Sequence, residues 1–292
     1  MSYTVFTDGC SNLPKQLLSS LQIRVVPCSY TLDGESHIFS GDMDGFDSRT
    51  YYDRLRHGAV LTTSLLNTQL FLDHFRPELE KGRDVVYVGL SSGVSGTIQS
   101  ARIAAVELAE EFPERTVRVV DSLGASFGPG LLACRAADLR NEGKTALQAG
   151  EVLDRETMEL QQFFTVDDLN FLKRTGRVGG ATAAIGTILH IKPLLWGDTT
   201  GHIVVRGKYR GRKKAIEAIV ELYRELAVEP QNRRVAISHG DCPEDAKLLA
   251  ERICEIAKPG ELIICPHEPF TGGHVGPGML GLYFFGQSRE AL

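Results

Sequence analysis

The feature that most constrains this chain is the alternation, through its first half, of short β-branched runs with segments of helical length. Thr4–Asp8, Asp84–Leu90 and Val117–Asp121 are typical of strands, whereas Gln69–Lys81 and Gly96–Glu111 are amphipathic stretches typical of helices. This alternation predicts an α/β fold, in which helices cover a parallel sheet. The same pattern predicts strands at Ile23–Ser29, Arg234–Ser238 and Leu262–Cys265, and helices at Ala125–Asn141 and Leu147–Gln161.

The second half has a different pattern. It opens on Phe163-Phe164-Thr165, becomes rich in Gly and Ala, and then shows a β-rich run at Ile203–Val205 and a helical pattern over 211–227. The length of 292 residues suits two domains. We therefore predict domains at 1–165 and 166–292. Because no low-complexity linker separates them, we expect a sizeable shared interface, which is a favoured place for a ligand.

Three predicted strands end in polar residues, at Thr7-Asp8-Gly9, Asp121-Ser122 and His239-Gly240-Asp241. Such strand ends are where α/β folds place ligands. For Asp241 we predict a plain helix cap instead, because Pro243 follows at a natural first helical position.

Composition excludes several classes of protein. With 32 basic and 37 acidic residues the formal charge is −5, and 42% of the residues are hydrophobic. Neither a disordered chain nor a generally basic nucleic-acid binder has this balance. Six cysteines without CxxC pairs suggest a reducing compartment. The sequence starts without a signal-peptide pattern, and its most apolar stretch, Val178–Ile191, is too short to span a bilayer. We therefore expect a cytoplasmic protein.

Positive charge is concentrated between Lys173 and Lys214. This window holds ten basic residues and one acid, Asp198, so its charge is +9 and the rest of the chain carries −14. Such a window favours a surface that docks a partner or binds phosphate. The alternative is a solvated helix face at 212–214 together with lysine stems that pack on strands.

A Ser- and Gly-rich turn, Ser91-Ser92-Gly93-Val94-Ser95-Gly96-Thr97, follows a predicted strand and opens a helix. Free backbone N–H groups at a helix N-terminus can bind an anion. The turn lacks the lysine of a P-loop, so a carboxylate suits its hydroxyls better than a nucleotide. Ordinary helix capping by Ser92 or Ser95 is the alternative.

The sequence gives less support to a hydrolase site and to a metal site. Ser95 with His274, oriented by Asp8 or Asp121, would make a hydrolase, but the G-x-S-x-G spacing is not met. Cys265 and the histidines at 239, 267 and 274 lack the spacing of a metal site, so we predict none. We expect the histidines at 202, 239 and 267 to be satisfied or exposed side chains.

Several motifs together resemble the DegV family. Thr7-Asp8-Gly-Cys-Ser-Asn-Leu-Pro14 is similar to its T-D-S opening, Thr62-Thr63-Ser64 to its T-T-S element, and Ser91–Ser100 to its S-S-x-x-S-G-T-x-x-S element. Further blocks follow in order over nearly the whole chain. They are Val119–Ser122, Leu172–Arg177, Ile191–Pro193, Arg210–Ala215 and His274–Gly278. Departures are Gly9-Cys10 in place of Ser and Thr/Ser, Leu65 in place of Gln, and Val275 in place of Thr.

The resemblance implies a bacterial fatty acid-binding protein with the FakB role. It implies two domains, an N-terminal α/β/α domain with a parallel sheet and a C-terminal α/β domain with a mixed sheet, whose last segment could pack back on the first. One long-chain fatty acid would lie between the domains. The protein would use no cofactor or metal and would have no catalytic residues. A separate fatty acid kinase would phosphorylate the carboxylate, giving acyl-phosphate for phospholipid synthesis.

The resemblance also assigns roles to particular residues. Neutral or weakly charged donors would bind the carboxylate and leave it nucleophilic, unlike an arginine clamp. Burying about 14 methylenes at ~0.8 kcal/mol each would stabilise binding by about 11 kcal/mol before association costs. The carboxylate-binding candidates are Thr63, Ser64, Ser92, Ser95, Gly96 and His274, and the kinase-docking candidates are Arg174, Arg177 and Arg206.

Alternatives remain for function and partners. The chain could be a Ser/His-dependent acyl hydrolase or transferase that uses Ser95 and His274, or a small-anion or sugar-phosphate enzyme that uses the Ser-rich turn. The basic residues could steer ATP phosphates or make transient contact with anionic lipid headgroups instead of docking a kinase. Because no heptad or apolar repeat is visible, we expect a monomer. Because the chain as a whole is acidic, we expect it to bind no nucleic acid.

Overall fold

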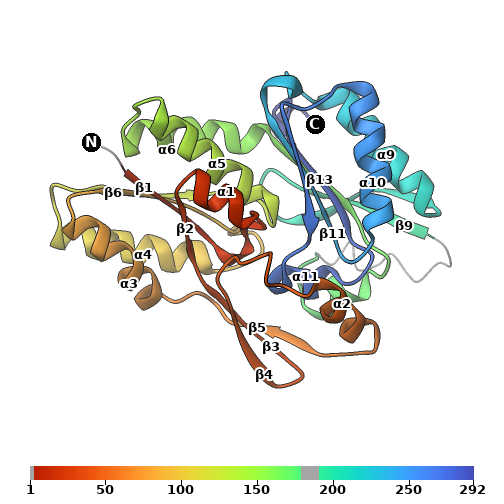
Figure 1. Ribbon diagram of the computed structural model, residues 1–292, viewed down its shortest axis with the longest axis horizontal. Helices are drawn as coiled ribbons and strands as arrows, with labels where there is room; N and C mark the ends of the chain where they lie inside the picture. Colours follow the sequence, from red (N-terminus) through yellow and green to blue (C-terminus); the bar gives the residue numbers. More distant parts are fainter. Residues whose placement is uncertain (1–2, 179–190) are drawn as a thin grey trace. The chain divides into compact units, whose positions relative to one another are not determined.

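The computed structural model describes residues 3–178 and 191–292, and the chain divides into two compact units (Figure 1). Unit 1 comprises Met1–Phe46 and Thr62–Thr157, and unit 2 comprises Asp47–Leu61 and Met158–Leu292. This division differs from the boundary predicted at residue 165 in two ways. The segment Asp47–Leu61 belongs to unit 2 although it interrupts unit 1 in sequence, and unit 2 resumes at Met158 rather than at residue 166. The C-terminal segment lies in unit 2.

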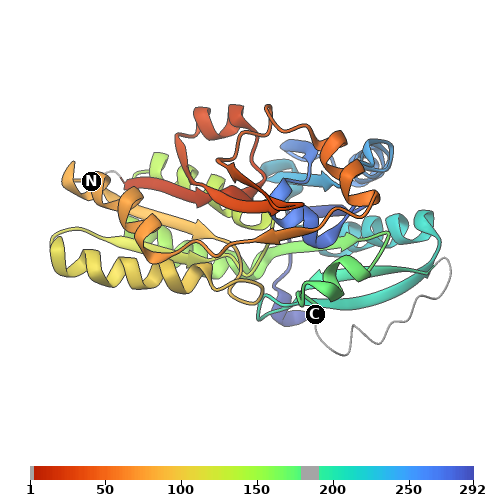
Figure 2. The same cartoon turned by 90° about the horizontal axis from the view of Figure 1, so that it is seen from below.

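Unit 1 is built on a parallel sheet in the order β2-β1-β6-β7. Its strands are β1 (Tyr3–Asp8), β2 (Ile23–Val26), β6 (Asp84–Gly89) and β7 (Val117–Asp121). In Figure 2 the arrows of β1 and β6 run in the same direction. The helices of this part of the chain are α1 (Lys15–Ser20), α3 (Thr68–Glu80), α4 (Thr97–Glu111), α5 (Phe127–Asn141) and α6 (Ala146–Glu159). The predicted parallel α/β unit is confirmed, since β-branched strands alternate with helices that cover them (Figure 1).

A second, three-stranded sheet has the order β4-β3-β5, with β3 (Cys28–Leu32), β4 (Glu35–Phe39) and β5 (Leu61–Thr63). The strand predicted over Ile23–Ser29 is therefore two strands. Pro27, which has no amide hydrogen for a ladder, separates them. Asp33 and Gly34 join β3 to β4 with positive φ angles of 54° and 84°, as a tight hairpin turn requires.

Unit 2 is built on a mixed sheet in the order β10-β9-β8-β13-β11-β12. Among the described strands of this sheet, β11 and β12 pair in parallel and the other neighbours pair antiparallel, which confirms the predicted mixed sheet. The strands are β8 (Leu160–Thr165), β9 (Ile191–Gly197), β10 (Ile203–Arg210), β11 (Arg234–His239), β12 (Glu261–Pro266) and β13 (Leu280–Phe285). The helices are α2 (Ser48–Arg56), α7 (Asn170–Arg174), α9 (Arg212–Leu226), α10 (Pro243–Ile256) and α11 (Pro269–Val275). Three short 3₁₀ turns complete the described chain, η1 (Gly9–Ser11), η2 (Pro230–Asn232) and η3 (Arg289–Ala291).

The core of unit 2 lies between its sheet and the helices α9 and α10 (Figure 1). Ile219 and Tyr223 of α9 and Ile253 of α10 pack with Phe163 of β8 and Phe284 of β13. Because β8 contributes to this core and pairs with β9 and β13, it belongs to unit 2. The helix predicted over Leu147–Gln161 therefore ends at Glu159, where β8 begins.

No helix among the described residues combines the length and the apolar character needed to cross a membrane. Residues 179–190, which make up most of the apolar stretch Val178–Ile191, lie outside the described residues.

Candidate functional site

In unit 1 the Ser-rich turn connects β6 to α4, and most of its backbone amides already have partners. Ser92 N–H donates to Asp121 Oδ1 at 3.2 Å, and Gly93 N–H donates to Ser91 Oγ at 3.0 Å. The amides of Val94 and Ser95 donate to the carbonyl of Ser91. The prediction that free amides of this turn bind an anion is therefore wrong for residues 92–95. The donors that Ser92 and Ser95 can still offer to a ligand are their hydroxyl groups.

Ser95 has a capping role as well as a half-buried hydroxyl. Its Oγ accepts a hydrogen bond from Thr97 N–H at 3.3 Å and lies 3.0 Å from Thr97 Oγ1. When Thr97 donates in that second contact, the Ser95 proton is available to a ligand oxygen. Ser92 is exposed, and Gly96, the exposed N-cap residue of α4, has no side chain in the way of a ligand.

Two carboxylates at strand ends position this turn. Asp8, at the end of β1, is fully buried, and its Oδ2 accepts hydrogen bonds from Tyr87 Oη at 2.8 Å and Leu90 N–H at 3.0 Å. Burial raises the pKa of Asp8, and these hydrogen bonds oppose that rise. Asp121, at the end of β7, accepts from Ser92 and Leu123 N–H groups through one oxygen. In the described structure, both aspartates support the turn.

The T-T-S element lies beside the Ser-rich turn. Thr62 and Thr63 end β5, where the Thr62 hydroxyl pairs with that of Thr31 and Ser64 N–H donates to the Ser29 carbonyl at 3.1 Å. Thr63 is half-buried and Ser64 is exposed. A Cβ built on Gly96 would lie 3.4 Å from Leu65 Cδ1, so the two elements are neighbours within unit 1.

A groove of about 260 Å³ opens next to the T-T-S element. Its wall includes the apolar side chains of Leu65, Leu66 and Leu70 but also Asn67 and Asp73. A groove with polar walls that opens to solvent would leave much of a long hydrocarbon chain exposed to water.

In unit 2 the candidate His274 lies in α11, and its side chain is buried. Burial, together with the positive charges of Arg177 and Arg174, lowers the pKa of His274 to about 4. His274 is therefore a neutral imidazole at neutral pH. It can offer a ligand one N–H donor without a full positive charge.

A buried hydrogen-bond network fixes the start of α11. Glu268 is fully buried and caps the helix, accepting from the N–H groups of Phe270 at 2.5 Å and Thr271 at 2.9 Å. His267 Nε2 lies 2.7 Å from Thr271 Oγ1, and its Nδ1 lies 3.0 Å from Ser238 Oγ. Burial lowers the pKa of His267 to about 3, so this histidine is also neutral. The expectation that His267 is a satisfied side chain is confirmed.

Helix α2 contacts α11, and the two helices lie next to each other in Figure 1. Tyr51 Oη donates to the Pro269 carbonyl at 2.6 Å, and Tyr52 Oη donates to the His267 carbonyl at 2.9 Å. A Cβ on Gly272 would lie 2.4 Å from Tyr52 Oη, and one on Gly273 would lie 2.7 Å from Tyr51 Oη. Glycine is required at both positions because the tyrosines approach the helix so closely.

No pattern in the sequence predicts that Tyr51 and Tyr52 position α11. Tyr51 and Tyr52 lie more than two hundred residues from α11 along the chain. The Glu268-Pro269 pair did carry a signal, because an acidic cap followed by proline is typical of a helix start. The predicted cap at Asp241 is wrong. Cys242 is the N-cap of α10, and Asp241 forms an ion pair with Arg56 at 2.5 Å.

The basic window is partly neutralised by acids that lie outside it in sequence. Lys192 pairs with Asp167 at 2.6 Å, and Arg212 pairs with Asp245 at 2.8 Å. The exposed Arg174 stacks on the Phe171 ring, with 4.2 Å between the guanidinium carbon and the ring centroid. The half-buried Arg177 donates to the carbonyl of Thr175.

Arg206 belongs to an exposed basic stripe on β10. It stacks on the Trp196 ring at 5.1 Å, and Arg206, Lys208 and Arg210 alternate with less exposed residues. Since β10 is an edge strand of the sheet, this stripe faces solvent.

Comparison with known proteins agrees with these motifs. The model of the family described as "Uncharacterised protein, DegV family" matches residues 2–287. The chain belongs to the DegV family. A DegV domain-containing protein of Clostridium perfringens is 33% identical over 288 residues, which cover 99% of each chain.

Two solved DegV structures are similar over nearly their full length. A DegV family protein of Thermus thermophilus, described by its fatty acid binding, matches with a TM-score of 0.87 and 33% identity, covering 98% of this chain and 100% of the other. DegV of Bacillus subtilis, described as a fatty acid-binding protein, matches with a TM-score of 0.82 and 30% identity, covering 97% and 98%.

One departure of this DegV chain from the family motif has a structural reason. A Cβ on Gly9 would lie 2.7 Å from the backbone oxygen of Phe39 and 3.1 Å from Cys28 Sγ. The usual serine cannot occupy position 9 unless the small sheet shifts.

The predicted carboxylate-binding residues of this DegV protein thus fall into two groups. Thr63, Ser64, Ser92, Ser95 and Gly96 gather in unit 1, whereas His274 lies in unit 2 next to Arg174 and Arg177.

Proposed function

We propose that this protein binds one long-chain fatty acid through residues of both units and presents the carboxylate to a fatty acid kinase. The observation that carries the proposal is the kind of donor that each unit offers, which is hydroxyl groups in unit 1 and a neutral imidazole in unit 2. The fatty acid binding described for the related proteins of Thermus thermophilus and Bacillus subtilis supports the ligand class.

A neutral donor set suits a carboxylate that must react. In the proposed reaction a carboxylate oxygen attacks the γ-phosphorus of ATP, the bond to the β-γ bridging oxygen breaks, and ADP leaves. Hydrogen bonds from Thr63, Ser95 and His274 orient the carboxylate and leave its charge available. A bidentate arginine would stabilise the ground-state anion more strongly and so raise the barrier to attack.

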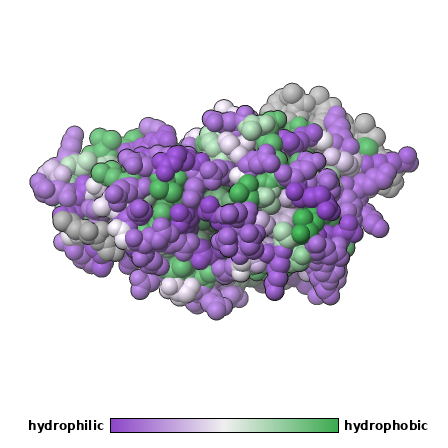
Figure 3. Space-filling model, turned by 90° about the horizontal axis from the view of Figure 1, so that it is seen from above, coloured by the Kyte–Doolittle hydropathy of each residue, from purple (hydrophilic) through white to green (hydrophobic). Residues whose placement is uncertain are grey.

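The hydrocarbon chain requires a buried site. The face of the molecule seen in Figure 3 is mostly hydrophilic, with hydrophobic atoms in small separate patches. Because burial of about 14 methylenes provides most of the binding energy, at ~0.8 kcal/mol each, an interior site is favoured over this face.

Native mass spectrometry of the purified chain tests the ligand. We expect one adduct of long-chain fatty acid mass per chain, unchanged after prolonged incubation. With the partner kinase and ATP, the wild-type protein should support acyl-phosphate formation, while Ser95→Ala and His274→Ala should reduce it at least tenfold, as expected for the loss of about 1.4 kcal/mol. Ser20→Ala, an exposed serine of α1, is the control.

Two outcomes would contradict the proposal. One is wild-type turnover in both variants. The other is hydrolysis of an ester or thioester by the isolated chain, which would favour the acyl hydrolase.

The exposed basic side chains provide the proposed docking surface for the kinase. Arg206 is exposed on β10 and Arg174 is exposed at the end of α7. We expect Arg206→Glu and Arg177→Glu to weaken kinase-dependent turnover, more at low than at high salt, and to leave the fatty acid adduct intact. Lys247→Glu on α10 is the matched charge reversal outside the basic window. Equal loss of binding and turnover would assign a structural role to the arginine.

A further inference from the structure

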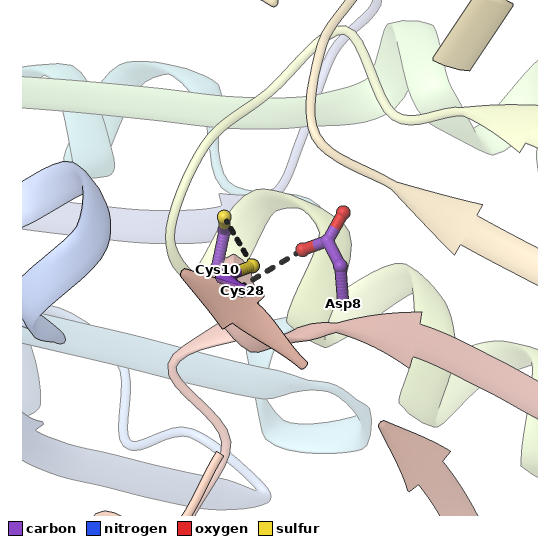
Figure 4. Close-up of side chains that lie close together, drawn as sticks. All are labelled: Asp8, Cys10 and Cys28. Carbon is purple, nitrogen blue, oxygen red and sulfur yellow. Dashed lines mark hydrogen bonds between the residues drawn. The ribbon is translucent and has the colours of Figure 1, made fainter. Parts of the chain in front are cut away.

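Two thiols and a carboxylate of unit 1 meet in a fully buried cluster (Figure 4). Asp8 ends β1, Cys10 lies in the turn η1 and Cys28 begins β3. The two sulfur atoms are in direct contact at 3.4 Å, and the two cysteines are only 1% and 0% exposed. All three possible ligand atoms lie within 4.8 Å of one another.

Gly9 allows this approach. Cys28 Sγ would lie 3.1 Å from a Cβ at position 9, and the Phe39 carbonyl oxygen would lie even closer, at 2.7 Å. A larger residue would push β3 away from η1 and separate the sulfurs. The contact between the two cysteines therefore depends on the glycine at position 9, where this chain departs from the family motif.

Asp8 is placed to accept a proton from the pair. Its Oδ1 accepts the backbone N–H of Cys10 at 3.0 Å, and the Cys10 side chain also hydrogen-bonds to the carboxylate. Burial raises the pKa of Asp8, which makes it a stronger base than an exposed aspartate. A proton can thus pass from Cys10 to Asp8, and the Cys28 thiol can donate to Cys10.

We propose that Cys10 and Cys28 are a redox-active dithiol that a small peroxide converts to a disulfide. The Cys10 thiolate, after giving its proton to Asp8, attacks one oxygen of hydrogen peroxide. The O–O bond breaks, and the products are a Cys10 sulfenic acid and a hydroxide that takes the proton from Asp8 and leaves as water. Cys28 sulfur then attacks Cys10 sulfur, the S–O bond breaks, and the Cys28 proton leaves with the hydroxyl as a second water. Two thiols lose two electrons and one peroxide becomes two waters.

The geometry favours a disulfide over a metal site. Closure requires the sulfurs to move from 3.4 Å to about 2.05 Å, a small change for two flexible side chains. A metal ion would have to displace hydrogen bonds from Asp8, whose oxygens already accept from Cys10 N–H, Tyr87 Oη and Leu90 N–H. Closure would tie η1 to β3. Since Asp8 also binds the Leu90 amide, we expect the exchange of that amide with solvent to slow.

The experiment uses the purified full chain, first reduced and then treated with hydrogen peroxide. Thiols counted in denaturant should fall from six to four, and the intact mass should fall by two hydrogens. Peptide mapping should show Cys10 joined to Cys28. The oxidised protein should melt about 5–10 °C higher than the reduced one, and a dithiol reductant should reverse the shift.

Substitution of single cysteines tests whether Cys10 and Cys28 form the disulfide. Cys10→Ser should keep all five remaining thiols, because the thiol that attacks peroxide is absent. Cys28→Ser should lose one thiol, as a Cys10 sulfenic acid that has no neighbour to resolve it, and Cys254→Ser, outside the cluster, should still lose two. Six retained thiols, stable sulfinic acids or a bond to another cysteine would overturn the proposal. So would stoichiometric zinc binding that requires both cysteines and blocks oxidation, because it would assign a metal site. If the serine variants do not fold, the wild-type peptide map alone decides.

Discussion

The Ser-rich turn of unit 1 and helix α11 of unit 2 are both candidate ligand sites, but different side chains hold the two elements in place by hydrogen bonds. The turn is positioned by Asp8 and Asp121, whose oxygens accept backbone amides. Helix α11 is positioned by Glu268 at its start and by the neutral His267. Two tyrosines of α2 donate to the carbonyls of His267 and Pro269. Unfolded histidines bind protons below their ordinary pKa of 6.5, whereas an unfolded glutamate does so only below about 4.5, so we expect unit 2 to lose stability at a higher pH than unit 1.

Among the single substitutions, the largest effect is expected for Glu268→Ala. This change leaves the Phe270 and Thr271 amides without their buried acceptor, so the variant should lose about 3 kcal/mol of stability. Urea unfolding followed by Trp196 fluorescence measures the loss in unit 2, because this is the chain's one tryptophan and it lies in β9.

Glu221→Gln is the matched control. Glu221 pairs with Arg224 on the exposed face of α9, and its removal should cost less than about 0.5 kcal/mol. Equal losses in the two variants would show that Glu268 does not fix α11.

The next effect is the pH dependence of unit 2. The pKa of His274 is lowered to about 4 and that of His267 to about 3, so both histidines bind a proton more readily in the unfolded chain. Stability should be fully present above the ordinary value of 6.5 and should fall as pH decreases below it. Each histidine contributes about 1.4 kcal/mol per pH unit within its window. The urea midpoint from Trp196 fluorescence should decrease from pH 6.5 to pH 4.5.

His274→Gln should reduce the slope of that decrease. A midpoint that stays constant over this range would contradict the buried, neutral state of both histidines.

A smaller effect is expected for Glu78→Gln in unit 1. Burial raises the pKa of Glu78, but hydrogen bonds from Thr4, Lys81 and Arg83 and the charge of Arg24 lower it to about 2. The ionised form should therefore contribute about 2–3 kcal/mol, which is lost as pH falls from 4.5 towards 2. Because no tryptophan lies in unit 1, amide hydrogen exchange of β1 is the suitable measurement.

Glu111→Gln is the control for this variant, because Glu111 forms an exposed pair with Arg76. Protection of β1 that is equal in the two variants would show that the Glu78 cluster adds nothing to the stability of unit 1.

The parts of the fold predicted from sequence are those with a strong local pattern. The four strands of the parallel sheet are β-branched runs, and three of them, β1, β6 and β7, lie close to their expected limits, whereas β2 ends early, before Pro27. The strand β8 was not predicted, because Gln161 and Gln162 continue the polar pattern of α6 and hide a fully buried strand. The Asp33-Gly34 hairpin did have a turn signal, although it forms no part of the predicted βαβ pattern.

For the candidate site, the hydroxyl motifs were visible but their hydrogen-bond partners were not. Nothing in the sequence around Ser92 indicates that its amide binds Asp121, which lies at the end of another strand. The same holds for the assignment of Asp47–Leu61 to unit 2, which depends on Tyr51 and Tyr52 packing against a helix near the other end of the chain.

The most direct test of the central claim is NMR of a fatty acid labelled with ¹³C at its carboxyl carbon and bound to the purified protein. The account predicts one bound carboxyl signal in slow exchange, shifted by Ser95→Ala and by His274→Ala and unchanged by Ser20→Ala. A bound signal that neither site variant moves would place the carboxylate elsewhere, and no bound signal at all would contradict fatty acid binding by this chain.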